Sequence, residues 1–275
     1  MSEKMRHSRL ELILSLLLLG LIVGLMIYAS AFCPFASNEL TSAGKLAPPS
    51  AEHPMGTDHL SRSILVRVGE GASGTLLVAF GTVLLGAFYG LILGALAGYF
   101  GGWADWLISR FTDSLLAFPG ILMSLLVITV LGRGIPQLIF ALGLAFTPSY
   151  ARLVRSAFRQ YRGRNYIKRL EVVGTPPLRI LFVHMLPLLR SQSLNALGIG
   201  LANAILAESS MSFLGFGIQP PRPSWGSMLA EAQPYIFQAP WLALFPGLAI
   251  VLTVFAIFLL ARSGQQLLEE RGGAR

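Results

Sequence analysis

Six long apolar stretches constrain this chain more than any other sequence feature. A helix needs roughly 20 apolar residues to cross the hydrocarbon core of a bilayer. Because lipid offers backbone amides no hydrogen-bonding partner, such segments cross a membrane as helices. The sequence therefore predicts an all-α membrane protein with about six transmembrane helices. The expected spans are about 10–31, 74–99, 111–131, 136–154, 186–207 and 241–261.

Composition supports a membrane location. Hydrophobic residues make up 54% of the chain and charged residues 12%, and the mean hydropathy is +0.65, which is too apolar for a soluble domain of this size. A net charge of +8 raises the alternative of nucleic-acid binding. The basic residues cluster beside apolar stretches, however, as the positive-inside bias predicts. We therefore expect a lipid membrane and no nucleic acid among the partners.

The N-terminus allows two interpretations. Lys4, Arg6 and Arg9 precede the first apolar stretch, and Ala29-Ser30-Ala31 resembles a signal-peptidase site. The stretch exceeds the usual length of a signal-peptide apolar region, which favours a retained first helix. Cys33 is the only cysteine, so the chain forms no intrachain disulfide.

A basic loop between the fourth and fifth stretches indicates the topology. Residues 151–190 contain nine Lys and Arg residues and a single acid, Glu171. The positive-inside bias places this loop and both termini in the cytoplasm of a multi-pass inner-membrane protein. The expected divisions are 1–9 cytoplasmic, 10–31 first span, 32–73 extracytoplasmic, 74–261 membrane core with a cytoplasmic loop at about 155–187, and 262–275 cytoplasmic tail.

Glycines recur at every fourth position of the second stretch, at Gly86, Gly90, Gly94 and Gly98. This spacing makes a small-residue groove along one helix face, where another helix backbone can approach closely. Packing within the chain and a seam with a second membrane subunit are both compatible with the pattern.

A proline–glycine pair lies inside the third stretch, at Pro119-Gly120. Proline removes a backbone donor and clashes with the preceding turn of a helix. We therefore expect a kink or an interruption in this span.

The basic loop also carries helix signals. Residues 166–173 are compatible with a short helix, Gly174 suits its left-handed C-terminal position, and Pro176-Pro177 prevent continuation. A second helix is expected to start near Leu178 and to lead towards the membrane at Pro187.

This helix–glycine–helix pattern resembles the cytoplasmic coupling loop of ATP-binding-cassette importer permeases of type I. Where family members commonly show Glu-Ala-Ala, this chain has Lys168-Arg169-Leu170. The alternative is an amphipathic basic loop that lies on anionic lipid. The resemblance rests on Tyr166, Gly174, Ile180, His184, Leu186 and Pro187. The coupling residues that it implies are Tyr166, Lys168, Arg169, Glu171, Gly174, His184 and Pro187.

A second signature occupies residues 208–229, where a span ends and a loop rich in glycine and proline follows. As a string it resembles the segment after the fifth span in C-type permeases of the dipeptide, oligopeptide and nickel uptake group. Residues 53–58, 132–134 and 150–155 add to the resemblance, which covers about 48–262. It implies that a translocation path or extracytoplasmic face includes Glu208, Ser212, Phe213, Gly215 and Trp225. Glu208 is the best path candidate, with a polar helix-end contact as the alternative, and Trp225 suits the membrane interface.

Two groups of residues suggest a binding site at first sight, but neither pattern predicts one. His53, Asp58 and His59 offer metal-ligand types, but a surface turn with Asp58 capping a following helix explains them better. Gly44-Lys45 lacks the remaining residues of a phosphate-binding loop. We therefore expect no metal, no cofactor and no catalysis in this chain, with ATP and Mg²⁺ in partner subunits.

The resemblance implies a permease subunit that works with a second homologous permease, two cytoplasmic ATPases and an extracytoplasmic solute-binding protein. Di- or oligopeptides are the expected substrates, and nickel or a nickel–metallophore complex is the alternative. A secondary transporter would show inverted repeats and midmembrane carboxylates, which are not evident. A membrane enzyme would need a paired acid and base or a metal-ligand cluster, also not evident.

Overall fold

A computed structural model describes residues 3–31 and 38–273 and is helical almost throughout; Cys33 lies outside the described residues. Within these ranges, no strands form beyond an isolated bridge between Thr57 and Ser63. The prediction of an all-α membrane protein is confirmed. Five of the described helices are long and apolar enough to span a membrane, and they are α1 (Glu3–Ala31), α2 (Ile64–Phe100), α5 (Ile135–Arg162), α8 (Arg190–Phe213) and α10 (Trp241–Gly273).

The third predicted span is broken rather than continuous. Helices α3 (Gly102–Leu116) and α4 (Gly120–Leu131) meet at an angle of 90°, and they make a sixth span only if the pair counts as one. Pro119 has extended backbone angles, with φ −56° and ψ 126°, at the start of α4. The expectation of a kink or an interruption at Pro119-Gly120 is therefore confirmed, and the helical pair begins at Gly102 rather than near residue 111.

Other boundaries also differ from the prediction, and three helices continue beyond their predicted ends: α5 to Arg162, α8 to Phe213 and α10 to Gly273. Helix α2 begins at Ile64 rather than at residue 74, so the end of the segment expected to be extracytoplasmic continues the helix. The fifth span begins at Arg190 rather than at residue 186. The chain before it forms short helical turns, which are α7 (Pro177–Arg179), a π-helical segment at Ile180–Met185 and a 3₁₀ segment at Leu186–Leu189.

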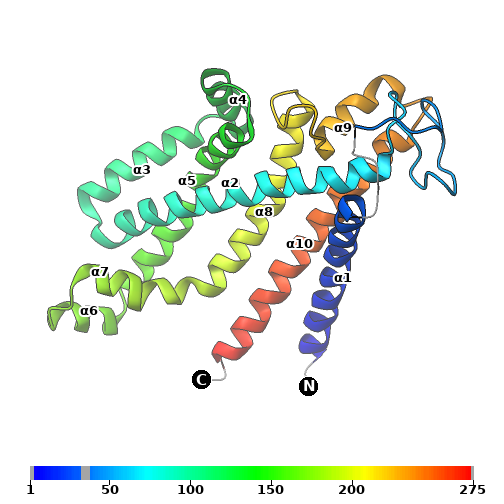
Figure 1. The fold of residues 1–275 in the computed structure, drawn as a ribbon. Helices are drawn as coiled ribbons and strands as arrows, with labels where there is room; N and C mark the ends of the chain where they lie inside the picture. Colours follow the sequence, from blue (N-terminus) through cyan, green and yellow to red (C-terminus); the bar gives the residue numbers. More distant parts are fainter. Residues whose placement is uncertain (1–2, 32–37, 274–275) are drawn as a thin grey trace.

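The described ends of the chain lie on the same side of the structure as the loop with α6 (Asn165–Val172) and α7, as Figure 1 shows. Residues 38–63 and α9 (Trp225–Ala232) lie at the opposite side. Helices α1 and α8 both pack against α10, and α2 packs along α5. Because both described ends lie on one side, the chain between them passes from one side to the other an even number of times.

The glycine row of α2 packs against α5 of the same chain. A Cβ on Gly90 would lie 2.5 Å from the Cβ of Tyr150, and one on Gly94 would lie 2.5 Å from the carbonyl oxygen of Ala151. Ordinary van der Waals contact begins near 3.4 Å, so a side chain here would force the helices apart. A Cβ on Gly86 or on Gly98 would also lie closer than 3.4 Å to atoms of α5.

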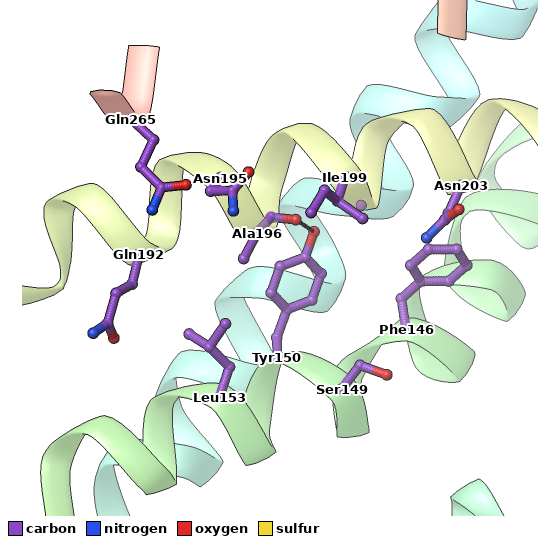
Figure 2. A pocket seen from close by; sticks show the side chains of 11 residues that line it. Phe146, Ser149, Tyr150, Leu153, Gln192, Asn195, Ala196, Ile199, Asn203 and Gln265 are labelled. Carbon is purple, nitrogen blue, oxygen red and sulfur yellow. Dashed lines mark hydrogen bonds between the residues drawn. The ribbon is translucent and has the colours of Figure 1, made fainter. Parts of the chain in front are cut away.

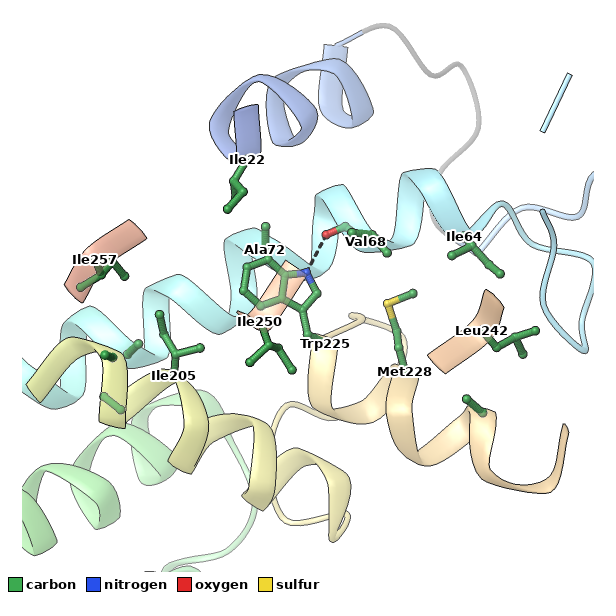
Figure 3. Close-up of a cluster of buried hydrophobic side chains, with 14 of the residues drawn as sticks. Ile22, Ile64, Val68, Ala72, Ile205, Trp225, Met228, Leu242, Ile250 and Ile257 are labelled. Atoms are coloured by element: carbon green, nitrogen blue, oxygen red, sulfur yellow. Dashed lines mark hydrogen bonds between the residues drawn. The ribbon is translucent and has the colours of Figure 1, made fainter. Parts of the chain in front are cut away.

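The largest buried cluster surrounds Trp225, where α2, α8, α9 and α10 meet (Figure 3). The indole ring is fully buried, and its Nε1–H donates to the carbonyl oxygen of Val68 over 2.9 Å. Burial of a large aromatic ring with a satisfied polar atom is strongly stabilising. This cluster fixes α9 against the N-terminal end of α2.

Candidate functional site

A cavity of about 480 Å³, lined by both polar and apolar side chains, lies between α5 and α8 and extends to the C-terminal part of α10 (Figure 2). Helix α8 contributes three amide side chains at positions 192, 195 and 203, a spacing that keeps them on one helix face. Helix α5 contributes Ser149 and the buried Tyr150, whose hydroxyl donates to the carbonyl oxygen of Ala196 over 3.3 Å. The polar residues that line the cavity are Ser149, Tyr150, Gln192, Asn195, Asn203 and Gln265.

A second cavity of about 360 Å³ adjoins the first and shares Phe146, Ser149 and Asn203 with it. It reaches Gly120 and Ser124 at the start of α4. The two cavities thus follow one face of α5 and α8 over much of their length. Among the described side chains that line them, none carries a charge.

This face exposes polar side chains, which is unusual for membrane helices. Ser149, Gln192 and Asn203 are exposed although they lie in α5 and α8, which are long enough to span a bilayer. Polar groups at membrane depth face a protein interior or a water-filled cavity, because contact with lipid tails is unfavourable. The face is therefore suited to line a path that another subunit completes. None of these residues was predicted, although amides inside an apolar stretch were a usable signal.

The basic loop contains the helix–glycine–helix structure expected from the sequence. Helix α6 ends in a turn in which Gly174 has φ +80°. The Gly174 N–H donates to the carbonyl oxygen of Glu171 over 3.1 Å, and the Thr175 N–H donates to that of Leu170 over 3.0 Å. This bonding pattern defines a Schellman motif and satisfies carbonyl groups at the helix end.

Buried side chains anchor the loop to α2 and α5. Ile167, Ile180 and Met185 are fully buried in a cluster with Phe158 and Tyr99. Polar contacts add to this anchor. Arg162 donates to the carbonyl oxygen of Tyr99 and lies 3.5 Å from Glu171, and Tyr161 donates to the carbonyl oxygen of Leu188 over 3.2 Å. The loop is therefore held as a packed unit against the membrane helices.

The outer surface of the loop is both basic and apolar. Lys168 and Arg169 are exposed, whereas His184 and Pro187 are half-buried. Partial burial raises the pKa of Tyr166, so its phenol is neutral at physiological pH. Exposed apolar side chains on the same loop are Val172, Val173, Leu178, Phe182 and Val183. Such a surface suits a protein partner better than water.

The second signature is a tightly packed structure rather than an open surface. Glu208 is fully buried, and its carboxylate accepts a hydrogen bond from the Ser212 hydroxyl over 2.6 Å. Glu208 lines neither of the two cavities, and its buried hydrogen bond fits the alternative of a polar contact near the helix end. Trp225 is also fully buried instead of lying at the membrane interface, because Val68 satisfies its indole N–H inside the protein. Phe213 and Gly215 are exposed at the end of α8.

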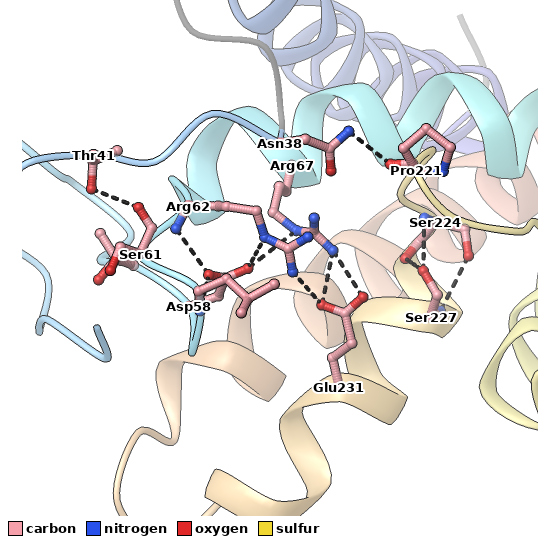
Figure 4. Close-up of polar contacts among 12 residues, drawn as sticks. Asn38, Thr41, Asp58, Ser61, Arg62, Arg67, Pro221, Ser224, Ser227 and Glu231 are labelled. Carbon is pink, nitrogen blue, oxygen red and sulfur yellow. Dashed lines mark hydrogen bonds and ion pairs between the residues drawn. The ribbon is translucent and has the colours of Figure 1, made fainter. Parts of the chain in front are cut away.

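An ion-pair cluster joins the segment 38–63 to α2 and α9 (Figure 4). Asp58 pairs with Arg62 at 2.6 Å, and Glu231 lies 2.9 Å from both Arg62 and Arg67. Asp58 Oδ1 accepts from the backbone N–H groups of Leu60 and Arg62, so it stabilises a turn rather than capping α2.

Three possible metal ligands do meet in this region. Atoms of Asp58, His59 and Glu231 lie within 4.8 Å of one another. Arg62 and Arg67 already neutralise both carboxylates, however, and a cation would have to displace them. His53 is not in the group. The geometry therefore favours an ion-pair network over a metal site.

The fold and the cavities define a class: a polytopic helical membrane protein with polar, uncharged side chains along one face and a packed loop at the end opposite to residues 38–63. Residues 90–272 match the family of the binding-protein-dependent transport system inner membrane component, and the chain belongs to this family. It is thus a transport permease subunit of the inner membrane. Membership implies ATPase and binding-protein partners.

Individual relatives share most of the chain. The dipeptide transport system permease protein DppC of Alkalihalophilus pseudofirmus is 38% identical over 85% of this chain and 80% of its own. The glutathione transport system permease protein GsiD of Pectobacterium atrosepticum is 37% identical, over 87% and 80%. The di/tripeptide transport system permease protein DppC of Pseudomonas aeruginosa is 36% identical, over 89% and 83%.

Proposed function

We propose that this chain is the peptide-translocating permease subunit of an ATP-driven importer. The observation that carries the proposal is the exposed, uncharged polar face of α5 and α8 on membrane helices. The face is open in the single chain, so a second homologous permease would complete the path. The names of the similar proteins, which refer to dipeptides, di/tripeptides and glutathione, support a peptide substrate.

The proposed assembly contains two permeases, two cytoplasmic ATPases and an extracytoplasmic solute-binding protein. Both termini and the loop with α6 and α7 face the cytoplasm, in agreement with the charge bias of the loop. The exposed surface of α6 docks on an ATPase, with Tyr166, Lys168, Arg169 and Glu171 near the contact. Because the loop is packed rigidly against α2 and α5, movement of the ATPases would reorient these helices.

Glu208, Ser212 and Trp225 take a supporting role in this proposal. All three are buried; Ser212 donates a hydrogen bond to Glu208 within α8, and Trp225 donates one to Val68 of α2, so these contacts hold the ends of α8 and α9 in place beside the path. Phe213 and Gly215, which are exposed, lie on the face that receives substrate from the binding protein. No residue of the chain is proposed to make or break a covalent bond.

Uptake measurements in cells test the proposal. Cells that lack this chain should lose uptake of a labelled di- or tripeptide, and expression of the chain should restore it. Nickel uptake is measured in the same cells with and without a chelator. Loss of nickel uptake with intact peptide uptake would contradict the peptide assignment, and loss of neither would contradict import altogether. Restored uptake should require ATP in the cytoplasm.

A further inference from the structure

We propose that the amide side chains along α8 bind the backbone of the passing peptide and make the path indifferent to the charge of peptide side chains. The inference rests on the proposed function and adds a specificity mechanism to it. Its central residues are Asn195 and Asn203, with Gln192 of α8 and, on the neighbouring helix α10, Gln265 at the cytoplasmic side (Figure 2).

Amide side chains match the chemistry of a peptide backbone. Each Asn or Gln offers two N–H donors and a carbonyl acceptor, and each peptide group offers one donor and one acceptor. Hydrogen bonds of this kind recognise every residue of a peptide in the same way. They also bring no net charge into a path with low dielectric constant.

The spacing of the amides fits a short peptide. Asn195 and Asn203 are eight positions apart on a helix, which corresponds to about 12 Å along its axis. An extended peptide advances about 3.3 Å per residue, so this distance spans roughly three to four residues. The cavity of about 480 Å³ falls within the range of small-ligand sites.

The charges of α5 are turned away from this face. Arg152 pairs with Asp113 at 2.9 Å, and Arg155 pairs with Asp105, both on α3. These arginines line a separate small pocket beside α2 and α3. Although α5 is rich in arginine, the side chains that it presents to the path are Phe146, Ser149, Tyr150 and Leu153. The path is therefore neutral because local ion pairs hold the cations elsewhere.

A charge introduced at the centre of the path tests this inference. The complete transporter, with its second permease, ATPases and binding protein, is reconstituted in proteoliposomes. Uptake is measured for three labelled tripeptides of equal length whose central residue is Lys, Ala or Glu. Asn203 is chosen for substitution because it is exposed and borders both cavities. Each rate is divided by the wild-type rate for the same peptide, which cancels the preference of the binding protein.

We expect opposite selectivity from two variants. Asn203→Asp should raise the ratio of Lys-peptide to Glu-peptide uptake by about tenfold, and Asn203→Lys should lower it by a similar factor, because a charge near the peptide attracts one sign and repels the other. Asn195→Asp should act in the same direction as Asn203→Asp. Gln160→Glu, an exposed position of α5 outside both cavities, is the matched control and should leave the ratio unchanged.

An unchanged ratio of Lys-peptide to Glu-peptide uptake in both Asn203 variants, with normal amounts of assembled transporter, would overturn the inference alone. A change in this uptake ratio in Gln160→Glu that is as large as the change in the Asn203 variants would also overturn the inference. If the wild-type transporter imports none of the tripeptides, the proposed function itself fails and this inference fails with it.

Discussion

Substitution of Gly94 by alanine tests whether close contact between α2 and α5 holds the membrane core together. An alanine Cβ would lie 2.5 Å from the carbonyl oxygen of Ala151 and 2.7 Å from the Cβ of Val154. Ordinary contact begins near 3.4 Å, so the helices would have to separate by about 1 Å at this point. Overpacking of this kind typically costs about 1–3 kcal/mol of the free energy of unfolding.

Alanine also has a higher helix propensity than glycine, by about 1 kcal/mol, and this gain must be separated from the clash. Gly24 provides the control, because it lies in α1 with no heavy atom within 4 Å of an added Cβ. Gly24→Ala should keep the propensity gain without a clash. The difference between the two variants then measures the packing cost of about 1–3 kcal/mol.

Thermal unfolding of the purified chain in detergent, followed by tryptophan fluorescence, measures this difference. A cost of 1 kcal/mol lowers the Tm of a chain of this size by about 2–4 °C. We therefore expect Gly94→Ala to unfold several degrees below Gly24→Ala. Equal unfolding temperatures would refute the argument that the glycine row exists for contact with α5. A Tm of Gly24→Ala below that of the wild type would show instead that α1 packs more closely than the structure indicates.

Three further predictions concern the packed ends of the molecule. Trp225→Phe keeps a buried ring but leaves the carbonyl oxygen of Val68 without its donor, so unfolding in detergent should require about 1–3 kcal/mol less. Glu231→Gln weakens the pairing of the buried Arg67 and should make residues 38–63 more sensitive to limited proteolysis, whereas unchanged cleavage would contradict a clamping role. Gly174→Ala places a Cβ at φ +80°, which costs about 1–2 kcal/mol; hydrogen exchange of α6 should accelerate by about tenfold, and unchanged exchange would show that the turn is not strained.

Features governed by local chemistry could be read from the sequence. The apolar stretches gave the spans, because only a helix satisfies its own backbone in lipid. Gly174 gave the end of α6, because the left-handed angle there favours glycine. Pro119 gave the break before α4, although the angle of 90° between α3 and α4 depends on packing that no local pattern contains.

Features that depend on contacts between distant segments were missed. Tryptophan is a residue type typical of the membrane interface. Val68, 157 positions away in the sequence, provides an acceptor for the indole N–H of Trp225 and allows complete burial. Glu208 lies near the end of an apolar stretch, where an ionised side chain would be expected. Ser212 lies one helical turn further along and donates a hydrogen bond to the buried carboxylate. The amide side chains of α8 were missed for another reason. Hydropathy averaged over a long apolar stretch conceals three polar residues that lie on one helix face.

Most of the strings that resemble the family lie away from the amide side chains proposed to meet the substrate; the exception is 150–155, whose Tyr150 and Leu153 line the first cavity. Arg133 from the 132–134 string lies over the ring of Phe216, and Arg62 joins Glu231 of α9 to the segment after residue 53. These contacts tie one end of the molecule together and do not involve Asn195 or Asn203. Relatives can therefore share the strings while their paths differ in lining. It follows that evidence about the substrate must come from positions such as Asn195 and Asn203, whereas the strings report chiefly on the fold.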